Sequence, residues 1–285
     1  MVSCNQSPAV VPRVGEGISR VEVSGQVMSY GWEDDIQFLC DLGMHHFESF
    51  KRNGDIGNLQ LAIEKFEHAV QLIPDSDPNK AGKLSNLGTA FWARFEQLGD
   101  MPDLEHAISN HKCAVQLIPD GHLNRPLCLN NLGNSFMTRF ERLGDVTDME
   151  NAISNHERAV QLTPDGHPDK PGRLNNLGNS FMTRFERLGD VTDMENAVSN
   201  RERAVQLTPD GHPEKPSRLC NLGNSRFERL GDMTDMENAI SHHERAVQLT
   251  PDGHPDKPSH LSDLGSSFST RFKRLGDVTD MENAF

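Results

Sequence analysis

The chain has 285 residues and a formal charge of −14 at pH 7, with 35 % hydrophobic, 6 % aromatic and 25 % charged residues. This acidic balance argues against nucleic acid and anionic membrane surfaces as partners, because both are negatively charged. No basic start is followed by an apolar run, and no window approaches the roughly eighteen apolar residues of a membrane span. We therefore expect a cytoplasmic protein.

Residues 1–30 contain Pro, Gly, Ser and Val without a helical period. We interpret them as a flexible N-terminal lead with one short strand. The remainder, residues 31–285, is a repeat array.

Three series of landmarks define the array. The Leu-Gly dipeptide recurs in steps of 45, 45, 45, 45 and 42 residues, and a Gly-Asp series and a Pro series keep the same register. The glycines of the first series are Gly43, Gly88, Gly133, Gly178, Gly223 and Gly265. This period predicts six repeats. We expect the last repeat to be truncated, since Phe285 falls in the first turns of its second helix.

The third repeat shows the expected first helix, helix A. Six residues fall within roughly 80° of one another at 100° per residue and form one apolar stripe: Leu129, Leu132, Gly133, Phe136, Phe140 and Leu143. Gly144 supplies the left-handed position that commonly ends a helix.

The second helix, helix B, follows after a short connector. Thr147 and Glu150 have the spacing of a capping box, which predicts that helix B starts at Thr147. Its apolar face spans roughly 120° and contains Met149, Ala152, Ile153, His156, Ala159 and Val160. The sequence Thr163-Pro164-Asp165-Gly166 matches a type I turn with proline second. Stacked antiparallel helix pairs follow from this pattern.

The fifth repeat lacks three residues, because NLGNSFMTRFERLGD in the fourth becomes NLGNSRFERLGD before Arg226. The missing Phe-Met-Thr removes the aromatic residue equivalent to Phe136 and turns later residues by roughly 60° on the helix. We expect the fifth and sixth repeats to be the least stable part of the array.

At these residues the sequence resembles the tetratricopeptide repeat, whose pattern appears as Leu129, Leu132, Gly133, Phe136, Ala152, His156, Ala159 and Pro164. The repeats are longer than the family's 34 residues. They look like the repeats of kinesin light chains and those that precede the caspase-like CHAT domain in fungal proteins. The resemblance implies an all-α superhelix, a solenoid of antiparallel helix pairs, with helix A lining a concave groove.

Asparagines gather on the helix A face opposite the apolar stripe. They are Asn86, Asn130, Asn131, Asn134, Asn175, Asn176, Asn179, Asn221 and Asn224. Because each amide offers donors and an acceptor, such a ladder could bind the backbone of a peptide. The alternative is structural: the amides bond to neighbouring helices or water and fix the angle between repeats.

Catalytic and metal-binding patterns are weak. The loop histidines His122, His167, His212 and His254 recur once per repeat, too far apart to share zinc readily. No H-E-x-x-H motif occurs, and the five cysteines have no regular spacing. We expect no enzyme activity, no metal and no small-molecule cofactor.

Three functional hypotheses stay open. The first is a non-enzymatic scaffold that binds an unidentified protein or peptide on the concave helix A face. The second is the sensing arm of a larger CHAT-type protease or signalling protein, of which this chain is a fragment. The third is a degenerate fragment, suggested by the deletion before Arg226 and by the unfinished sixth repeat.

Overall fold

The computed structural model describes residues 20–23, 26–29, 32–228, 233–276 and 278–284. It divides into two compact units, an N-terminal unit, Met1–Arg139, and a C-terminal unit, Phe140–Phe285. Helix α5 contains the boundary between them.

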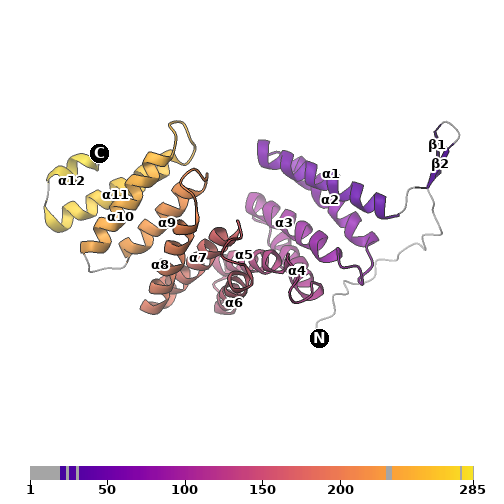
Figure 1. Cartoon of the computed structure of the whole chain (residues 1–285), viewed down its shortest axis with the longest axis horizontal. Helices are drawn as coiled ribbons and strands as arrows, with labels where there is room; N and C mark the ends of the chain where they lie inside the picture. Colours follow the sequence, from indigo (N-terminus) through magenta and orange to yellow (C-terminus); the bar gives the residue numbers. More distant parts are fainter. Residues whose placement is uncertain (1–19, 24–25, 30–31, 229–232, 277, 285) are drawn as a thin grey trace. The chain divides into compact units, whose positions relative to one another are not determined.

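The helices alternate between helix A of a repeat, with odd numbers, and helix B, with even numbers. From the N-terminus they are α1 (Trp32–Asn53), α2 (Ile56–Leu72), α3 (Lys80–Leu98), α4 (Met101–Leu117), α5 (Arg125–Leu143) and α6 (Val146–Leu162). They continue with α7 (Lys170–Leu188), α8 (Val191–Leu207), α9 (Lys215–Glu228), α10 (Met233–Leu249), α11 (Lys257–Leu275) and α12 (Val278–Asn283). Consecutive helices pack as pairs, for example α1 with α2 and α9 with α10 (Figure 1).

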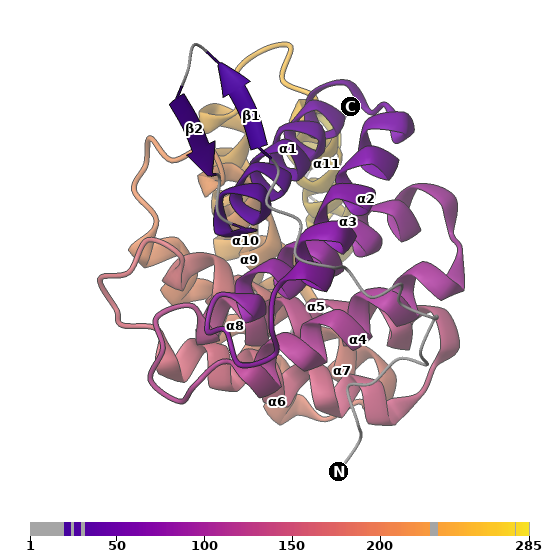
Figure 2. The same cartoon turned by 90° about the vertical axis from the view of Figure 1, so that its right-hand side faces the viewer.

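Two strands precede the helices, where the sequence predicts one. Strand β1 (Arg20–Val23) pairs antiparallel with β2 (Gln26–Ser29), with Arg20 opposite Ser29 (Figure 2). The rest of the predicted lead, residues 1–19, 24–25 and 30, lies outside the described residues.

The predicted apolar stripes are confirmed with two corrections. In α5 and α6 the stripe residues are buried, except that Leu143 is 61 % exposed and Val160 is partly buried. Leu143 is the last residue of α5, so no further turn of this helix covers its side chain. The described helices thus confirm the all-α class with paired helices.

A glycine of helix A allows close packing of helix B within each repeat. A methyl group at Gly88 would lie 2.6 Å from the His111 ring, and one at Gly223 would lie 2.6 Å from Cδ2 of His243. These contacts leave no room for a Cβ atom without a shift of the ring. The glycine of the Leu-Gly landmark therefore marks a close contact between helix A and helix B.

The turn between the two helices contains one confirmed prediction and one error. Gly144 has φ 74°, and its N–H donates to the Phe140 carbonyl at 2.7 Å, as a left-handed helix end requires. The capping box at Thr147 is wrong. Helix α6 begins at Val146, and the Asp145 carboxylate caps it by accepting a hydrogen bond from the Thr147 N–H at 2.9 Å. Asp145 lies two residues before Thr147, and its carboxylate, rather than the Thr147 hydroxyl, caps the helix.

The turn after helix B is also displaced from its predicted position. The His167 N–H donates to the Pro164 carbonyl at 3.0 Å, so Pro164 is the first residue of the turn rather than the second. Thr163 instead ends the helix, with its hydroxyl donating to the Ala159 carbonyl at 2.6 Å. A second turn follows, in which the Lys170 N–H donates to His167.

Candidate functional site

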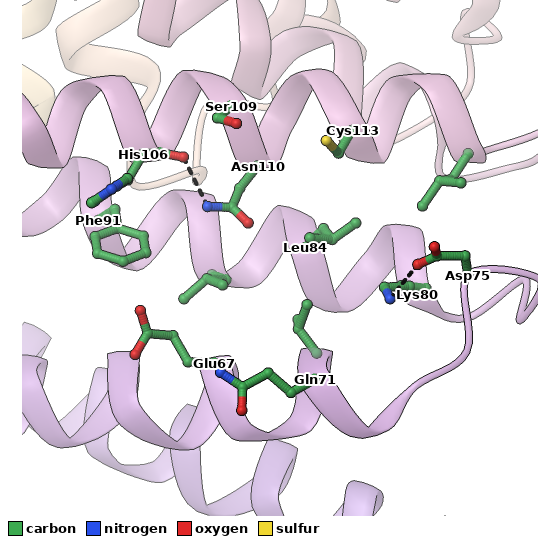
Figure 3. A pocket seen from close by; sticks show the side chains of 13 residues that line it. Glu67, Gln71, Asp75, Lys80, Leu84, Phe91, His106, Ser109, Asn110 and Cys113 are labelled. Atoms are coloured by element: carbon green, nitrogen blue, oxygen red, sulfur yellow. Dashed lines mark hydrogen bonds and ion pairs between the residues drawn. The ribbon is translucent and has the colours of Figure 1, made fainter. Parts of the chain in front are cut away.

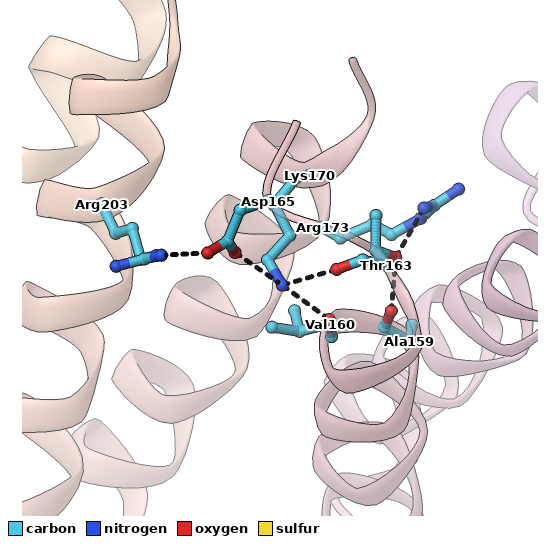
Figure 4. Close-up of polar contacts among 7 residues, drawn as sticks. All are labelled: Ala159, Val160, Thr163, Asp165, Lys170, Arg173 and Arg203. Carbon is cyan, nitrogen blue, oxygen red and sulfur yellow. Dashed lines mark hydrogen bonds and ion pairs between the residues drawn. The ribbon is translucent and has the colours of Figure 1, made fainter. Parts of the chain in front are cut away.

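Much of the recurrent polar sequence holds the repeats together. In the C-terminal unit, Nζ of Lys170 donates to the carbonyls of Val160 and Thr163, each at 2.8 Å (Figure 4). Lys215 and Lys257 make the same two bonds in the next repeats. The lysine of PDGHPDKP thus binds the free carbonyls at the end of the preceding helix B, where a cation also suits the helix dipole. The sequence pattern alone does not indicate this role.

The loop histidines also have a local role. Nδ1 of His167 accepts a hydrogen bond from the Asp169 N–H at 3.1 Å. The same bond recurs at His122, His212 and His254. This contact gives each of these four loop histidines a role in the turn that involves no ligand.

Arginine–aspartate pairs join the end of helix A to the start of helix B in the same repeat. Arg184 makes two bonds to Asp193, at 2.8 and 2.6 Å, and Arg94 makes two to Asp103. Arg184 also donates to Glu150 of the preceding helix B at 2.9 Å. Because the aspartates are almost fully buried, these pairs fix the register of the helices.

Histidine–serine pairs join neighbouring repeats. Nδ1 of His156 lies 2.8 Å from the Ser180 hydroxyl, and that of His111 lies 2.9 Å from Ser135. Burial lowers the pKa of His111 to about 4, so the ring is neutral at neutral pH. These rings therefore pack inside the array as buried neighbours of helix A.

The fourth repeat has Arg201 in place of this histidine. Its guanidinium donates to the Asn221 carbonyl at 2.9 Å, to the Asn179 amide oxygen at 2.9 Å and to the Ser225 hydroxyl. Its Nε is buried without a partner among the described residues. Burial lowers the pKa of Arg201 to about 10. A charged group here is less well accommodated than the imidazole it replaces.

The asparagines of the N-terminal unit are all partly buried on helix A. Nδ2 of Asn131 donates to the Ser85 hydroxyl of α3 at 3.2 Å, and Nδ2 of Asn86 contacts Sδ of Met44 at 3.8 Å. Asn130 and Asn134 lie on the same helix as Asn131. Asn131 and Asn86 therefore link neighbouring repeats.

Among the asparagines of the C-terminal unit, some make contacts between helices and others are exposed. Nδ2 of Asn221 donates to the Asn175 oxygen at 3.1 Å, between α9 and α7. Asn179 is exposed and bound to Arg201, Asn176 is partly buried, and Asn224 is exposed. The ladder therefore contains both interhelical contacts and accessible amides.

One groove lies on this helix A face in the N-terminal unit. It has a volume of about 320 Å³ and is named here the α3–α5 groove. Its polar lining includes Lys83, Ser85 and Asn86 of α3, and its apolar lining includes Leu127 of α5, which is 44 % exposed. The other lining residues are Pro78, Asn79, Ala81, Gly82, Ile118, His122, Asn124 and Cys128.

A second groove, the α2–α4 groove, lies on the other side of α3 (Figure 3). Its volume is about 310 Å³, and Leu84, Leu87 and Phe91 of α3 form its apolar floor. Its rims carry Glu67, Val70, Gln71 and Asp75 before α3, and His106, Ser109, Asn110, Cys113 and Leu117 on α4, with Lys80 at one end. At 100° per residue, the α3 residues of the two grooves are centred roughly 180° apart.

Reactive groups are few in the described part of the chain. Within it, no group of three or more His, Cys, Asp or Glu side chains is arranged to hold a metal ion. Burial raises the pKa of the thiols of Cys40 and Cys128, and that of Cys220 to about 12, so these are poor nucleophiles at neutral pH. None of the described helices combines the length and apolar character needed to cross a membrane.

No protein-family model matches the sequence, and no curated protein matches it. Solved structures match the fold. The nearly identical TPR-like repeats of a putative kinesin light chain from Podosopora anserina share 14 % identity, with a TM-score of 0.55 over 73 % of this chain and 94 % of that chain. A thermophilic TPR protein from Thermus thermophilus shares 17 %, with a TM-score of 0.55 over 80 % and 98 %.

A third match is BtubC (BKLC) from P. vanneervenii, with 16 % identity and a TM-score of 0.54 over 90 % of this chain and 88 % of that chain. At these identities the likeness concerns the fold. The chain therefore has the fold of the tetratricopeptide-like and kinesin light chain-like helical repeat proteins.

Proposed function

We propose that this chain is a non-enzymatic scaffold that binds a peptide or a partner protein on its helix A face. In the N-terminal unit, the proposed site is the α3–α5 groove. The observation that carries the proposal is the composition of this groove: a cation, an amide and a hydroxyl lie beside an exposed leucine. Peptide sites of this kind combine a few polar groups with apolar contact.

Lys83 and Asn86 are the residues proposed to contact the peptide. Both are partly buried, and both line the groove from α3. Lys83 suits carbonyl or carboxylate groups, while Asn86 offers both donors and an acceptor. Leu127 on the opposite side supplies apolar contact.

The test is affinity capture from a lysate of the source cells. The wild-type chain is compared with Lys83→Glu/Asn86→Ala, and Lys51→Glu is the control because this exposed lysine of α1 lies outside the groove. We expect the wild type and the control to capture the same partner and the double variant to lose it. Equal capture by all three, or capture by none, would contradict the proposal.

The structural alternative for the asparagine ladder requires a separate variant. Because Asn131 donates to Ser85, Asn131→Ala should lower the free energy of unfolding by about 1 kcal/mol. If the ladder is purely structural, Asn131→Ala weakens folding and leaves partner capture unchanged. Loss of capture at unchanged stability would place this amide at the binding surface.

A further inference from the structure

The α2–α4 groove is open at a position where later repeats carry an arginine. Cys113 of α4 has the same register as Arg158, Arg203 and Arg245, which follow in steps of 45, 45 and 42 residues. Most of the other lining residues keep their type in the later repeats, with an aspartate at positions 75, 120, 165 and 210, whereas His106 of the rim is replaced there by Asn151, Asn196 and Asn238. The second repeat therefore lacks a long cation that the later repeats carry at this position.

In the C-terminal unit this arginine spans neighbouring B helices. Nη2 of Arg203 on α8 lies 2.7 Å from the carboxylate of Asp165, which follows α6 (Figure 4). Lys170 approaches the same carboxylate at 3.5 Å. Arg245 repeats the contact with Asp210 at 3.5 Å, beside Lys215 at 3.5 Å. Each of these two aspartates therefore has two cations.

In the N-terminal unit the equivalent aspartate has the lysine and not the arginine. Asp75 pairs with Nζ of Lys80 at 2.6 Å, and its side chain is 84 % exposed. The short thiol of Cys113 occupies the arginine position on the facing helix (Figure 3). The groove is lined by the partly buried Val70 and, at its floor, by Leu84 and Leu87, which are 7 % and 4 % exposed.

We propose that the α2–α4 groove binds a segment of a partner protein that carries an arginine or lysine next to apolar side chains. The partner's cation takes the place held by Arg203 and Arg245 in the later repeats and pairs with Asp75. Its apolar side chains cover Val70, Leu84 and Leu87.

Two further observations support a basic partner. The exposed Glu67 lies on the same rim as Asp75, so a second cation on the segment would also meet a carboxylate. The hydrogen bond from Lys80 lowers the pKa of Asp75, so this carboxylate is ionised at neutral pH. The net charge of −14 also favours approach of a basic segment.

This inference goes beyond the function proposed above and does not depend on it. The α2–α4 groove and the α3–α5 groove use different α3 residues. Variants at Lys83 and Cys113 therefore test the two surfaces separately. A peptide bound in one groove should be insensitive to the variant in the other.

The test is selection of phage-displayed peptides, about twelve residues long, on the intact chain. The Cys113→Arg variant serves for counter-selection, because it restores the consensus residue and closes the groove. We expect the selected peptides to share an arginine or lysine beside Leu, Ile or Phe. Their affinity for Cys113→Arg should be lower by about tenfold or more. The result that would overturn the proposal is no peptide that distinguishes the two chains, or discriminating peptides without a basic residue.

Two more variants are tested for their affinity and number of binding sites with one selected peptide. Asp75→Asn keeps the groove and removes the charge, so it should weaken binding by about two- to fivefold. Arg203→Cys removes the bridging side chain from the equivalent place between α6 and α8, so calorimetry should give two binding sites per chain instead of one. Unchanged affinity for Asp75→Asn, or a single site in Arg203→Cys, would overturn the role assigned to the arginine position. Circular dichroism and urea unfolding check that each variant is folded.

Discussion

The fourth and fifth repeats are close copies, but the fifth is shorter by three residues, and the structure shows which contacts survive this loss. Helix α7 has 19 residues, and the described part of α9 has 14. Arg226 still pairs with Asp235, at 3.2 Å, as Arg184 does with Asp193. Ser225 still contacts the preceding helix B, through Arg201. The deletion therefore leaves the polar contacts on either side of it in place.

The deletion instead removes buried apolar side chains from the core of the fifth repeat. Phe181 and Met182 of the fourth repeat are each 6 % exposed, and the fifth repeat has no counterpart to either. The Arg184 guanidinium stacks on the Phe181 ring at 5.6 Å, whereas Arg226 follows Ser225 directly and its Nε is buried without a partner in the described part of the chain. In these two repeats, polar pairs keep the register of the helices, while the apolar residues supply stability.

The strongest test transfers the deletion to the fourth repeat. Removal of Phe181, Met182 and Thr183 should lower the free energy of unfolding by about 3–5 kcal/mol, the cost of deleting a large buried side chain. Insertion of Phe-Met-Thr before Arg226 should raise it, by about 1.5–3 kcal/mol. Urea unfolding measures both.

Hydrogen exchange on the unmodified chain tests the same comparison. Because the fifth repeat has the smaller core, amides in α9, α10 and α11 should exchange before those in α7 and α8. Uniform protection along these helices would contradict the expectation that the deletion marks the weakest part of the array.

A smaller effect is expected at the helix A glycines. Gly223→Ala places a methyl group 2.6 Å from Cδ2 of the His243 ring, while Gly178→Ala places one 2.8 Å from Cγ of Arg201. We expect each to cost about 1–3 kcal/mol of unfolding free energy, with the larger loss in the fifth repeat. Gly211→Ala, where no atom lies within 4 Å, is the control. Equal melting temperatures for all three variants would rule out the close contact.

Arg201→His makes the fourth repeat resemble the fifth. Since the change removes a buried charge and an unpaired Nε, the variant should gain about 1 kcal/mol of unfolding free energy. The reciprocal variant, His156→Arg, should lose a similar amount. A less stable Arg201→His chain would show that the three hydrogen bonds of Arg201 outweigh its desolvation.

The smallest expected effect depends on pH. Burial lowers the pKa of His243 from 6.5, so this histidine is protonated more readily in the unfolded chain. Its contribution to stability is therefore complete above about pH 6.5 and declines as the pH falls below that value. Arg201 does not titrate in this range. Between about pH 7.5 and about pH 5, the free energy of unfolding of Arg201→His should thus fall by more than that of the wild type. Parallel plots of unfolding free energy against pH for the two chains would contradict this.

The sequence predicts the helix pairs well because the apolar stripe and the glycine spacing are local patterns. It predicts the caps poorly where two candidates compete. Asp145 and Thr147 both fit a helix start, and only the backbone geometry shows that the Asp145 carboxylate accepts the Thr147 N–H. Leu143 fits the stripe, but the helix ends there and its side chain remains exposed.

The candidate sites show a similar limit. Asn131 and Asn221 fit the ladder by position, but their interhelical partners, Ser85 and Asn175, lie 46 residues away in the chain. These two pairs cannot be predicted from sequence spacing alone, because they depend on how the helices are placed relative to one another. Cys113, which aligns with an arginine in the later repeats, can in contrast be found from the sequence. Comparison of Cys113 with Arg203 and Arg245 is possible from the aligned repeats alone.

The contacts between repeats have a consequence for how such a chain changes over generations. The third, fourth and fifth repeats each present a serine on helix A and a histidine or arginine on helix B, and the partners in the described pairs are 24 residues apart, as in His111–Ser135, His156–Ser180 and His243–Ser267. Each copy therefore carries both halves of the junction. Unequal recombination that adds or removes a whole copy regenerates every junction, so the number of repeats can change while the side chains lining each groove diverge independently.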